Sequence, residues 1–337
     1  MSTTTPVHGD GDLRHFGMYL ARNRDIVEMF RKKASFMGAA REYLNRLGAI
    51  ELPMPNLQKY REGAPVHQFV TTHPFTKERF YLRHCMEDHL RRASGVFGKV
   101  YELGKAFRVE NEDRQRAIEF LVLEFVGPDI PYREGVRTVR GLIQHGVQSA
   151  FGELQVNGID FGALADRPFD SVMKGCLGFD SSDLDFRGKA AAALARKGVP
   201  APPEDWEVYE ELLKHYIEPS IQEPTVITDF PACLKHVCAI DEATGTAKRF
   251  SLIVNGVEIC DGGEKFGCSD GYRKVYEANA DYRRRQLGIT DNDEPVEFYD
   301  DIDALAGPVF TFGLGIDRCL AVFTGKSIQE VILFPHR

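Results

Sequence analysis

The sequence predicts an α+β fold in which a mostly antiparallel sheet is flanked by helices and carries a helical insertion. Two observations support this prediction. Alternating apolar runs separated by short turns fill much of the chain, and amphipathic helical patterns lie at its margins. With 337 residues, of which 43% are hydrophobic and 27% charged, the chain is long enough for one large domain or two ordinary ones with a sizeable core.

The first regular element is an amphipathic helix over residues 24–47. Its apolar residues recur at helical spacing, and Gly48 directly after them is a natural C-terminal stop. The segment that follows, AIELPMP, is expected to be short and extended, because its prolines suit the end or the edge of a sheet.

Strands are predicted next for the runs ERFYLRH, KVYELGKAFRVE and EFLVLEFV. In residues 249–260, RFSLIVNGVEIC, the pair Asn255-Gly256 predicts a tight hairpin, because both residues tolerate positive φ. Near the C-terminus, VFTFGLGIDRCLAVFTG predicts a strand, a glycine-rich corner and a helix that begins near Asp317 and ends at Gly325. The run VILFP is expected to form a last strand.

Residues 165–225 differ in character from the rest of the chain. They are rich in Ala, Lys, Asp and Pro, and they contain helical pieces such as GKAAAALARKG and WEVYEELLKHYI. We therefore expect a helical insertion at the edge of the sheet.

Composition narrows the class of protein. No apolar run approaches the roughly 18–20 residues of a membrane-spanning helix, and the polar start MSTTTPVHGDGD favours a cytoplasmic protein. A net charge of −8 argues against a general polyanion binder, and the basic run at residues 283–285 is better explained as a solvated helix face. Seven scattered cysteines suit reduced thiols; a zinc site built from Cys233, Cys238, Cys260 and Cys268 is the less favoured alternative.

The most informative stretch is AFRVENEDRQRAIEFLVLEF, residues 106–125. Alternation in a strand places Arg108 and Glu110 on one face, and the return strand brings Phe120 and Glu124 close to them. An arginine, acidic acceptors and an aromatic ring on one surface can hold a phosphate, a base amino group and a base ring. An exposed hairpin with cross-strand ion pairs explains this stretch equally well on its own.

Three motifs in order make the signal specific. The pattern FRVE…EF resembles motif 2 of class II aminoacyl-tRNA synthetases, residues 312–335 resemble motif 3, and RLGAIELPMPNL resembles motif 1. Within the class, the chain is most similar to the aspartate, asparagine and lysine subgroup and to the stand-alone lysyl-synthetase paralogue that modifies elongation factor P. The resemblance implies an N-terminal extension over 1–27, a catalytic domain over 28–337 that includes the 165–225 insertion, and no anticodon-binding domain.

The same resemblance implies a binding site for ATP. Arg108 would bridge the α-phosphate and the substrate carboxylate, Glu110 would accept from the adenine amino group, Phe120 would stack on adenine, and Arg116 would meet the γ-phosphate. Arg318 would clamp the other face of the base and the terminal phosphates of a bent ATP. Arg108 and Arg318 would thus be the catalytic residues.

Other positions in the motifs imply the cofactor and the shape of the nucleotide site. Gly313 and Gly315 would let the backbone approach the nucleotide, and Glu258 and Asp261 would bind Mg²⁺. Because a substrate carboxylate is already ionised, positioning and charge stabilisation suffice to form an aminoacyl-adenylate and pyrophosphate. Ser251 replaces a second acidic metal ligand of the family, which implies fewer or weaker Mg²⁺ sites.

Substrate-binding residues are also implied, and they bear on which amino acid is used. Glu87 matches a glutamate that holds the α-amino group, and Glu62 resembles the aspartate-type loop that closes over the same group. Glu124 matches one of two acidic residues that hold a lysine side chain. At the second acidic position this chain has Lys265, and Val126 replaces a tyrosine. A cation there repels lysine, so an acidic or amide side chain is favoured. The rival interpretation is that Lys265 pairs with Glu124 and leaves a pocket for a neutral or unusual amino acid.

The acceptor is the last open question. Without an anticodon-binding domain, an amine such as ammonia, a small molecule or a protein lysine is expected as acceptor rather than tRNA. The alternatives are a truncated synthetase that charges tRNA, a lysine-type ligase that modifies a protein, and a non-catalytic paralogue that binds an amino acid or nucleotide. Motif 1 implies a homodimer.

Overall fold

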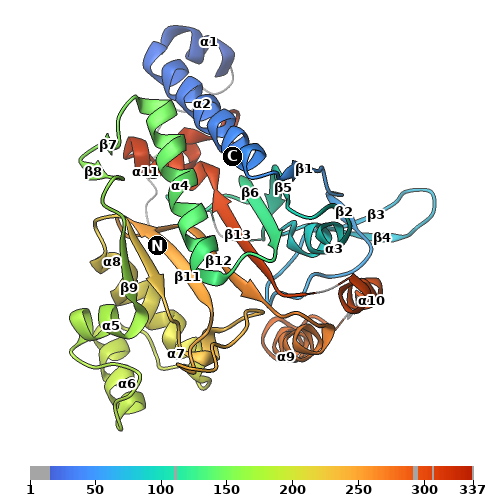
Figure 1. Ribbon diagram of the computed structural model, residues 1–337, viewed down its shortest axis with the longest axis vertical. Helices are drawn as coiled ribbons and strands as arrows, with labels where there is room; N and C mark the ends of the chain where they lie inside the picture. The colour runs from blue at the N-terminus through green and yellow to red at the C-terminus, as the bar shows by residue number, and fades with distance from the viewer. Residues whose placement is uncertain (1–15, 110–111, 291–294, 306, 336–337) are drawn as a thin grey trace.

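The computed structural model describes residues 16–109, 112–290, 295–305 and 307–335. Its centre is an eight-stranded sheet with the order β1-β5-β6-β13-β12-β11-β10-β9 (Figure 1). The two outer pairs, β1 with β5 and β9 with β10, are parallel, and every other neighbouring pair in this sheet is antiparallel. The predicted α+β class is therefore confirmed.

The strands of the structure have the following bounds: β1 (Ile50–Glu51), β2 (Leu57–Gln58), β3 (Val70–Thr72), β4 (Arg79–Leu82), β5 (Val100–Phe107), β6 (Glu119–Pro128), β7 (Gln155–Val156), β8 (Ile159–Asp160), β9 (Ala165–Pro168), β10 (Thr225–Thr228), β11 (Arg249–Val254), β12 (Val257–Lys265) and β13 (Val309–Gly315). Strands β2, β3 and β4 form a small separate sheet, and β7 pairs only with β8. The hairpin predicted at Asn255-Gly256 is confirmed: it joins β11 to β12, and the φ angles of the two residues are 49° and 73°.

The helices have these bounds: α1 (Phe16–Arg22), α2 (Arg24–Arg46), α3 (Glu87–Phe97), α4 (Tyr132–Phe151), α5 (Phe169–Leu177), α6 (Phe186–Arg196), α7 (Asp205–Leu212), α8 (Glu218–Ser220), α9 (Ser269–Leu287), α10 (Val296–Leu305) and α11 (Ile316–Thr324). A π-helix links α7 to α8 over Leu213–Ile217, and 3₁₀ turns occur at Ala232–Leu234 and Ile328–Val331. No helix among the described residues is long and apolar enough to cross a membrane.

One face of the sheet forms the main core. Figure 1 shows α4 crossing this face, with α2 beside it. The side chains that point to it are apolar and buried, and they include the stacked pairs Phe125–Phe312 and Phe250–Phe310, whose ring centroids are 5.2 and 5.7 Å apart. Because this face is filled by aromatic rings and helices, the opposite face is the one left for polar chemistry.

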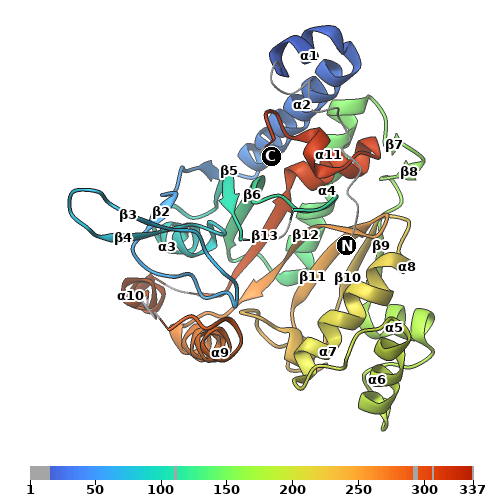
Figure 2. The ribbon, with the colours of Figure 1, turned by 180° about the vertical axis from the view of Figure 1, so that it is seen from behind.

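The opposite face is bordered by two groups of helices. Seen from behind, α3, α9 and α10 lie to one side, and α5, α6 and α7 lie to the other (Figure 2). The second group belongs to the predicted insertion, whose helices connect the outermost strands β9 and β10 and bury a core of their own around Phe169, Leu194 and Leu212.

The predicted last strand, VILFP, is wrong. Residues 328–331 form a 3₁₀ turn that begins with a capping box between Ser327 and Glu330. Val331 is buried beside Met29 and Leu320, and Phe334 has a φ of 54°, which an extended strand does not tolerate. Packing and a capped turn therefore override the strand propensity of this run.

Candidate active site

All the candidate strand residues face the same side of the sheet because of the register between strands. Asp261 on β12 is opposite Gly313 on β13, and Gly313 is opposite Glu124 on β6. Phe120 is opposite Ala106 on β5, so Arg108, two residues beyond Ala106, continues the same face. Its backbone N–H donates to Ile118 O at 2.9 Å, which extends the pairing past the end of β5.

A bulge in β12 brings the two candidate metal ligands to one face. The register skips Ile259: Glu258 is opposite Ile253, and Cys260 is already opposite Leu252. In a regular strand, residues 258 and 261 would point to opposite faces, since they are three positions apart. The extra residue restores the alternation, so Glu258 and Asp261 both face the cavity and not the aromatic core.

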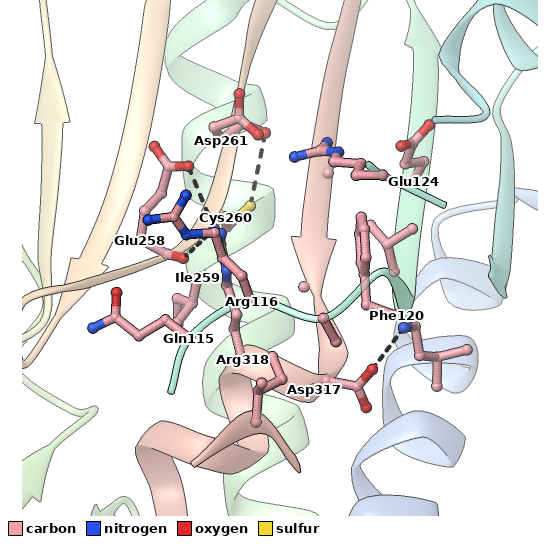
Figure 3. Close-up of a pocket in the computed structure, with 17 residues that line it drawn as sticks. Gln115, Arg116, Phe120, Glu124, Glu258, Ile259, Cys260, Asp261, Asp317 and Arg318 are labelled. Carbon is pink, nitrogen blue, oxygen red and sulfur yellow. Dashed lines mark hydrogen bonds and ion pairs between the residues drawn. The ribbon is translucent and has the colours of Figure 1, made fainter. Parts of the chain in front are cut away.

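The first cavity has a volume of about 100 Å³ and lies over β6, β12 and β13. Figure 3 shows Glu258 and Asp261 on one side of it and Phe120 and Glu124 on the other. The sequence-predicted residues that line it are Arg108, Arg116, Phe120, Glu124, Glu258, Asp261, Gly313, Gly315 and Arg318. Glu110, the predicted adenine acceptor, lies outside the described residues.

Three arginines reach this cavity from different elements. The Arg108 guanidinium lies 5.1 Å from the centre of the Phe120 ring, a cation–π contact. Arg318, in the first turn of α11, donates to Glu258 O at 3.1 Å. Arg116, in the loop between β5 and β6, pairs with Asp113 at 3.0 Å and is half exposed. Positive charge is thus collected where polyphosphate would have to bind.

The floor of the cavity depends on glycine. A Cβ at Gly313 would lie 3.8 Å from both Asp261 Oδ1 and Glu124 Cγ, so the missing side chain leaves the space between these carboxylates open. Asp317, which was predicted only as the start of a helix, lies behind this floor. Its buried carboxylate pairs with Lys33 of α2 and accepts from the backbone N–H of Leu121 at 2.6 Å, which fixes α11 against β6.

Glu258 and Asp261 fit a divalent cation with oxygen ligands. Burial raises the pKa of Glu258, and the negative charge of Asp261 adds to this effect. Two crowded carboxylates are stabilised by a hard cation such as Mg²⁺. Ser251, at the position where the family has an acidic residue, faces the same side of the sheet. Its hydroxyl donates a hydrogen bond to the Glu258 carboxylate and so orients it.

A second cavity of about 550 Å³ continues from the first and shares four lining residues with it: Arg108, Glu124, Asp261 and Gly313. Glu62, Glu87 and Lys265 also line it. Together with Arg108 and Glu124 they are the five predicted substrate-binding residues, and all five line this one cavity. Any group bound here would lie next to a nucleotide bound in the first cavity.

Lys265 pairs with Glu87, not with Glu124. Its Nζ lies 3.2 Å from Glu87 Oε2, and both groups are largely buried. The rival interpretation, a Lys265–Glu124 pair, is therefore corrected. Glu124 instead accepts from the backbone N–H of Met86 at 2.7 Å. Burial raises the pKa of Glu124 to about 8, and the nearby charge of Glu87 contributes.

Glu62 is held from several directions. Its carboxylate pairs with His84 Nδ1 and accepts from the His84 backbone N–H at 2.7 Å and from Gln58 Nε2 at 2.9 Å. Burial opposes its ionisation, but the charge and hydrogen bonds of His84 outweigh burial and lower the pKa of Glu62. The loop after it is fastened to α9, because Asn279 Nδ2 donates to Gly63 O at 2.8 Å.

The sequence analysis missed several residues around this cavity: His84, Cys85, Asp88, Tyr276 and Asn279. His84, Cys85 and Asp88 had one local signal, the cluster of polar residues in HCMEDH that surrounds Glu87, whereas Tyr276 and Asn279 lie on α9, far from it in the sequence. The prediction of a solvated helix face for the basic run at residues 283–285 does not hold for Arg283. Arg283 is buried and donates to Ala64 O at 2.9 Å, so it is not part of a solvated face.

The less favoured hypothesis of a zinc site is not supported, because the structure does not bring its four cysteines, Cys233, Cys238, Cys260 and Cys268, together as metal ligands. Cys233 and Cys268 are exposed, whereas Cys238 and Cys260 are buried. Across the described ranges, the side chains that approach one another as metal ligands are instead Glu62, His84 and Cys85.

Comparisons of the sequence with known proteins identify the family. The sequence profile of the family described as tRNA synthetases class II (D, K and N) matches residues 11–337. The chain is 29% identical to a lysine–tRNA ligase of Methanospirillum hungatei over 326 residues, which cover 93% of this chain and 64% of the relative. It is also 29% identical to that of a Roseiflexus species (98% and 70% covered) and 30% identical to that of Dehalococcoides mccartyi (94% and 66%).

The chain thus spans about two thirds of the length of these relatives. The match nevertheless runs through nearly all of the chain, and it includes every strand that carries a candidate residue. The chain therefore belongs to the class II tRNA synthetase family of the D, K and N group.

Proposed function

We propose that the chain is a ligase that uses ATP to activate an amino acid as an aminoacyl-adenylate. The observation that supports this most is the junction of the two cavities at Arg108, Glu124, Asp261 and Gly313. A nucleotide in the first cavity and an amino acid in the second would meet at Arg108. Holding the two reactants in line with each other provides a large share of the rate enhancement in a reaction of this kind.

In this proposal the arginines bind and stabilise charge. Arg108 would contact the α-phosphate and the attacking carboxylate, and Phe120 would stack on adenine once the Arg108 guanidinium turns to the phosphate. Arg116 and Arg318 would hold the terminal phosphates. Mg²⁺ held by Glu258 and Asp261 would neutralise phosphate charge. No general base is needed, because the substrate carboxylate is already ionised.

For the amino acid, we propose an acidic, amide or other polar side chain ahead of lysine. Glu62 and Glu87 would hold the α-amino group. The Lys265 ammonium has three N–H donors, and one of them faces Glu87 Oε2, which lies 3.2 Å from Nζ. An oxygen of the substrate side chain would accept a hydrogen bond from a second N–H. A buried ammonium that already has one carboxylate partner favours a second acceptor over a second cation.

Lysine is the second candidate, and a specific observation favours it. Glu124 forms no ion pair among the described residues, and burial together with the nearby charge of Glu87 raises its pKa to about 8. The relatives named above are lysine–tRNA ligases. An ammonium group at Glu124 would supply the missing charge.

We also propose an acceptor amine other than tRNA. A net charge of −8 opposes binding of a polyphosphate chain, and its effect increases at low salt. The alternative is transfer to tRNA. Incubation of the chain with ATP, the amino acid and total tRNA should separate the two: a tRNA pool that stays uncharged would support the proposal, whereas acid-precipitable aminoacyl-tRNA would support the alternative.

A homodimer is proposed through the edge strand β1. Ile50 on this edge and Val96 and Phe97 at the end of α3 are exposed large apolar residues, which a monomer would leave in water. Light scattering should give twice the chain mass of 37.9 kDa. A monomer at micromolar concentration would contradict this proposal.

The activation itself is tested by ATP–pyrophosphate exchange over a panel of amino acids with Mg²⁺. Exchange with aspartate, asparagine or a related polar amino acid is expected, and it should be lost in Arg108→Ala. Exchange that depends strongly on lysine would favour the second candidate. No exchange with any amino acid would favour a paralogue that binds without catalysis.

A further inference from the structure

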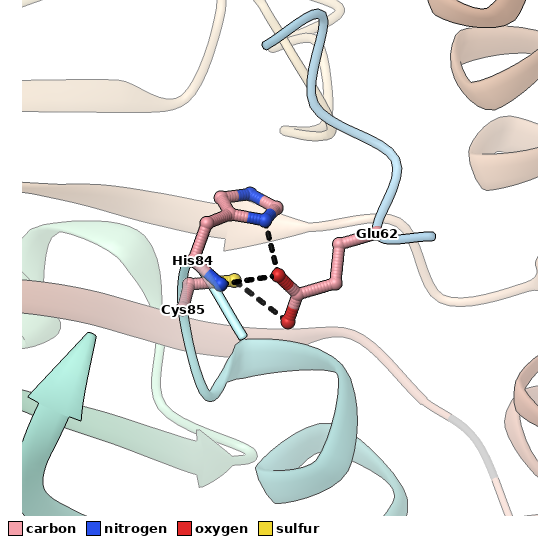
Figure 4. A group of neighbouring side chains, drawn as sticks. All are labelled: Glu62, His84 and Cys85. Atoms are coloured by element: carbon pink, nitrogen blue, oxygen red, sulfur yellow. Dashed lines mark hydrogen bonds and ion pairs between the residues drawn. The ribbon is translucent and has the colours of Figure 1, made fainter. Parts of the chain in front are cut away.

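One cluster in the second cavity joins Glu62, which the proposed function places near the α-amino group, to two residues that the proposed reaction does not use, His84 and Cys85. Figure 4 shows the side chains of Glu62, His84 and Cys85 turned toward one another. Each offers one ligand atom, a carboxylate oxygen, an imidazole nitrogen and a sulfur, and these three atoms all lie within 4.8 Å of one another. Glu62 and His84 are only 2% and 8% exposed, and all three residues line the cavity wall.

The ligand types match a particular kind of cation. Carboxylate, imidazole and thiolate together are the donor set of zinc, with bonds of about 2.0–2.3 Å, which places tetrahedral donors roughly 3.5 Å apart. The present contacts are compatible with this: Cys85 Sγ lies 3.9 Å from Glu62 Oε1, and His84 Nδ1 already points to Glu62. Small side-chain movements would place all three donors around one ion.

The surroundings of Glu62 resemble the support of a metal ligand. Besides His84 and Cys85, its carboxylate accepts from Gln58 Nε2 at 2.9 Å, from Gln68 Nε2 at 3.2 Å and from the His84 backbone N–H at 2.7 Å. Hydrogen bonds of this kind fix the orientation of a ligating carboxylate and are part of many metal sites.

A second, independent observation points to a missing positive group. Asp88 lines the same cavity and is 6% exposed, yet its Oδ2 has no hydrogen-bond partner among the described residues. Its other oxygen accepts from Tyr276 at 2.8 Å. Buried carboxylate oxygens without partners are costly. A water or an amine bound to a nearby cation would provide the donor that Oδ2 lacks.

We propose that Glu62, His84 and Cys85 bind a zinc ion whose fourth position opens into the amino-acid cavity. A water molecule, or the amine nitrogen of the substrate, would take that position. The involvement of the substrate rests on the proposed function, whereas metal binding does not. Three protein ligands with one open position are the arrangement of zinc sites that act on a ligand.

This site is distinct in chemistry from the one at Glu258 and Asp261. Those residues offer only oxygen, which suits Mg²⁺, while a thiolate and an imidazole suit transition metals such as zinc, for which cobalt is a weaker-binding substitute. Cobalt is therefore a useful probe, because a Co²⁺–thiolate bond gives a charge-transfer band in the near ultraviolet that oxygen ligands do not give.

The experiment uses the full chain without a histidine tag. Zinc is measured by mass spectrometry after dialysis against a weak chelator, and the apo protein is titrated with Co²⁺ in the absence of ATP and amino acid. About one zinc per chain and a thiolate band that saturates at about one Co²⁺ are expected. Cys85→Ser should lose the band and lower zinc to about a tenth or less, and His84→Ala should lower zinc similarly. The exposed Cys268→Ser is the control and should retain both signals.

Two outcomes would overturn the proposal. One is a wild-type chain that retains no zinc and gives no thiolate band at stoichiometric Co²⁺. The other is metal binding that survives Cys85→Ser and His84→Ala in variants whose circular dichroism matches the wild type. Neither outcome depends on pyrophosphate exchange, so failure of the zinc site and failure of the proposed function remain distinguishable.

Discussion

Lys265 Nζ lies 3.2 Å from Glu87 Oε2, and this ion pair joins the end of β12 to the first turn of α3. Both partners line the second cavity, and Thr311 Oγ1 lies 3.4 Å from the same carboxylate oxygen. The pair thus sets the charge of the cavity wall. Removing one partner would leave the other charge buried without compensation.

Changing Lys265 to glutamate should reverse the preference of the cavity. Lys265→Glu would place two carboxylates side by side, and a substrate cation would relieve their repulsion. We expect the ratio of kcat/KM for lysine to that for aspartate or asparagine to rise roughly 100-fold. Lys274→Glu, the same charge change at an exposed residue of the same cavity, should change it by less than about threefold. An unchanged profile in Lys265→Glu would show that this residue does not select the substrate.

Removing the Arg318 guanidinium should impair adenylate formation. Arg318→Ala deletes a donor aimed at the nucleotide cavity, and a loss of about 10²–10³-fold in kcat for pyrophosphate exchange is expected. The measurement needs saturating ATP and Mg²⁺. Arg284→Ala, at an exposed arginine that pairs with Asp281, serves as control and should retain the wild-type rate. Equal rates in both variants would remove Arg318 from the mechanism.

Substitution by alanine should affect the melting temperature differently at two glycines in neighbouring strands, Gly313 on β13 and Gly262 on β12. At Gly313 a Cβ finds ordinary contacts at 3.8 Å, so Gly313→Ala should fold with a melting temperature close to that of the wild type and raise the KM for ATP by filling the cavity floor. At Gly262 a Cβ would lie 2.1 Å from Thr311 O, so Gly262→Ala should unfold several degrees earlier. Thermal scans and ATP titrations of the pair would test this contrast. Equal melting temperatures would contradict the close approach of β12 and β13.

The buried Glu124 should make stability depend on pH. Its pKa is raised from 4.5 to about 8, so the folded chain retains a proton that the unfolded chain has lost. Stability should therefore fall as pH rises from about 4.5 to about 8 and then level off. In Glu124→Gln this part of the decline should disappear in urea titrations at several pH values. Glu297→Gln, at an exposed carboxyl, should follow the wild type. Parallel curves for all three proteins would show that Glu124 is not protonated in this way.

The sequence predicted best what depends on neighbours in the chain. The turn at Asn255-Gly256 and the end of α2 at Gly48 follow from backbone preferences of single residues, and both are confirmed. Arg108, Glu258 and Arg318, which the motif resemblance names, line one cavity, and their roles there remain predictions. The resemblance could not give the partner of Lys265, because Glu87 is distant in sequence and only the tertiary fold brings the two together. The run VILFP has strand propensity, but burial of Val331 and the turn at Phe334 decided its structure.

Ile259 gives β12 one residue more than its partner strand needs, and the spacing of two acidic side chains depends on that surplus. Deleting Ile259 would leave Glu258 and Asp261 two positions apart in a regular strand, so both carboxylates would still face the cavity. The local bend and twist of the bulge would be lost, and the two carboxylates would meet a cation at a different separation and angle. Cation binding should consequently depend on the length of β12 as well as on its acidic residues.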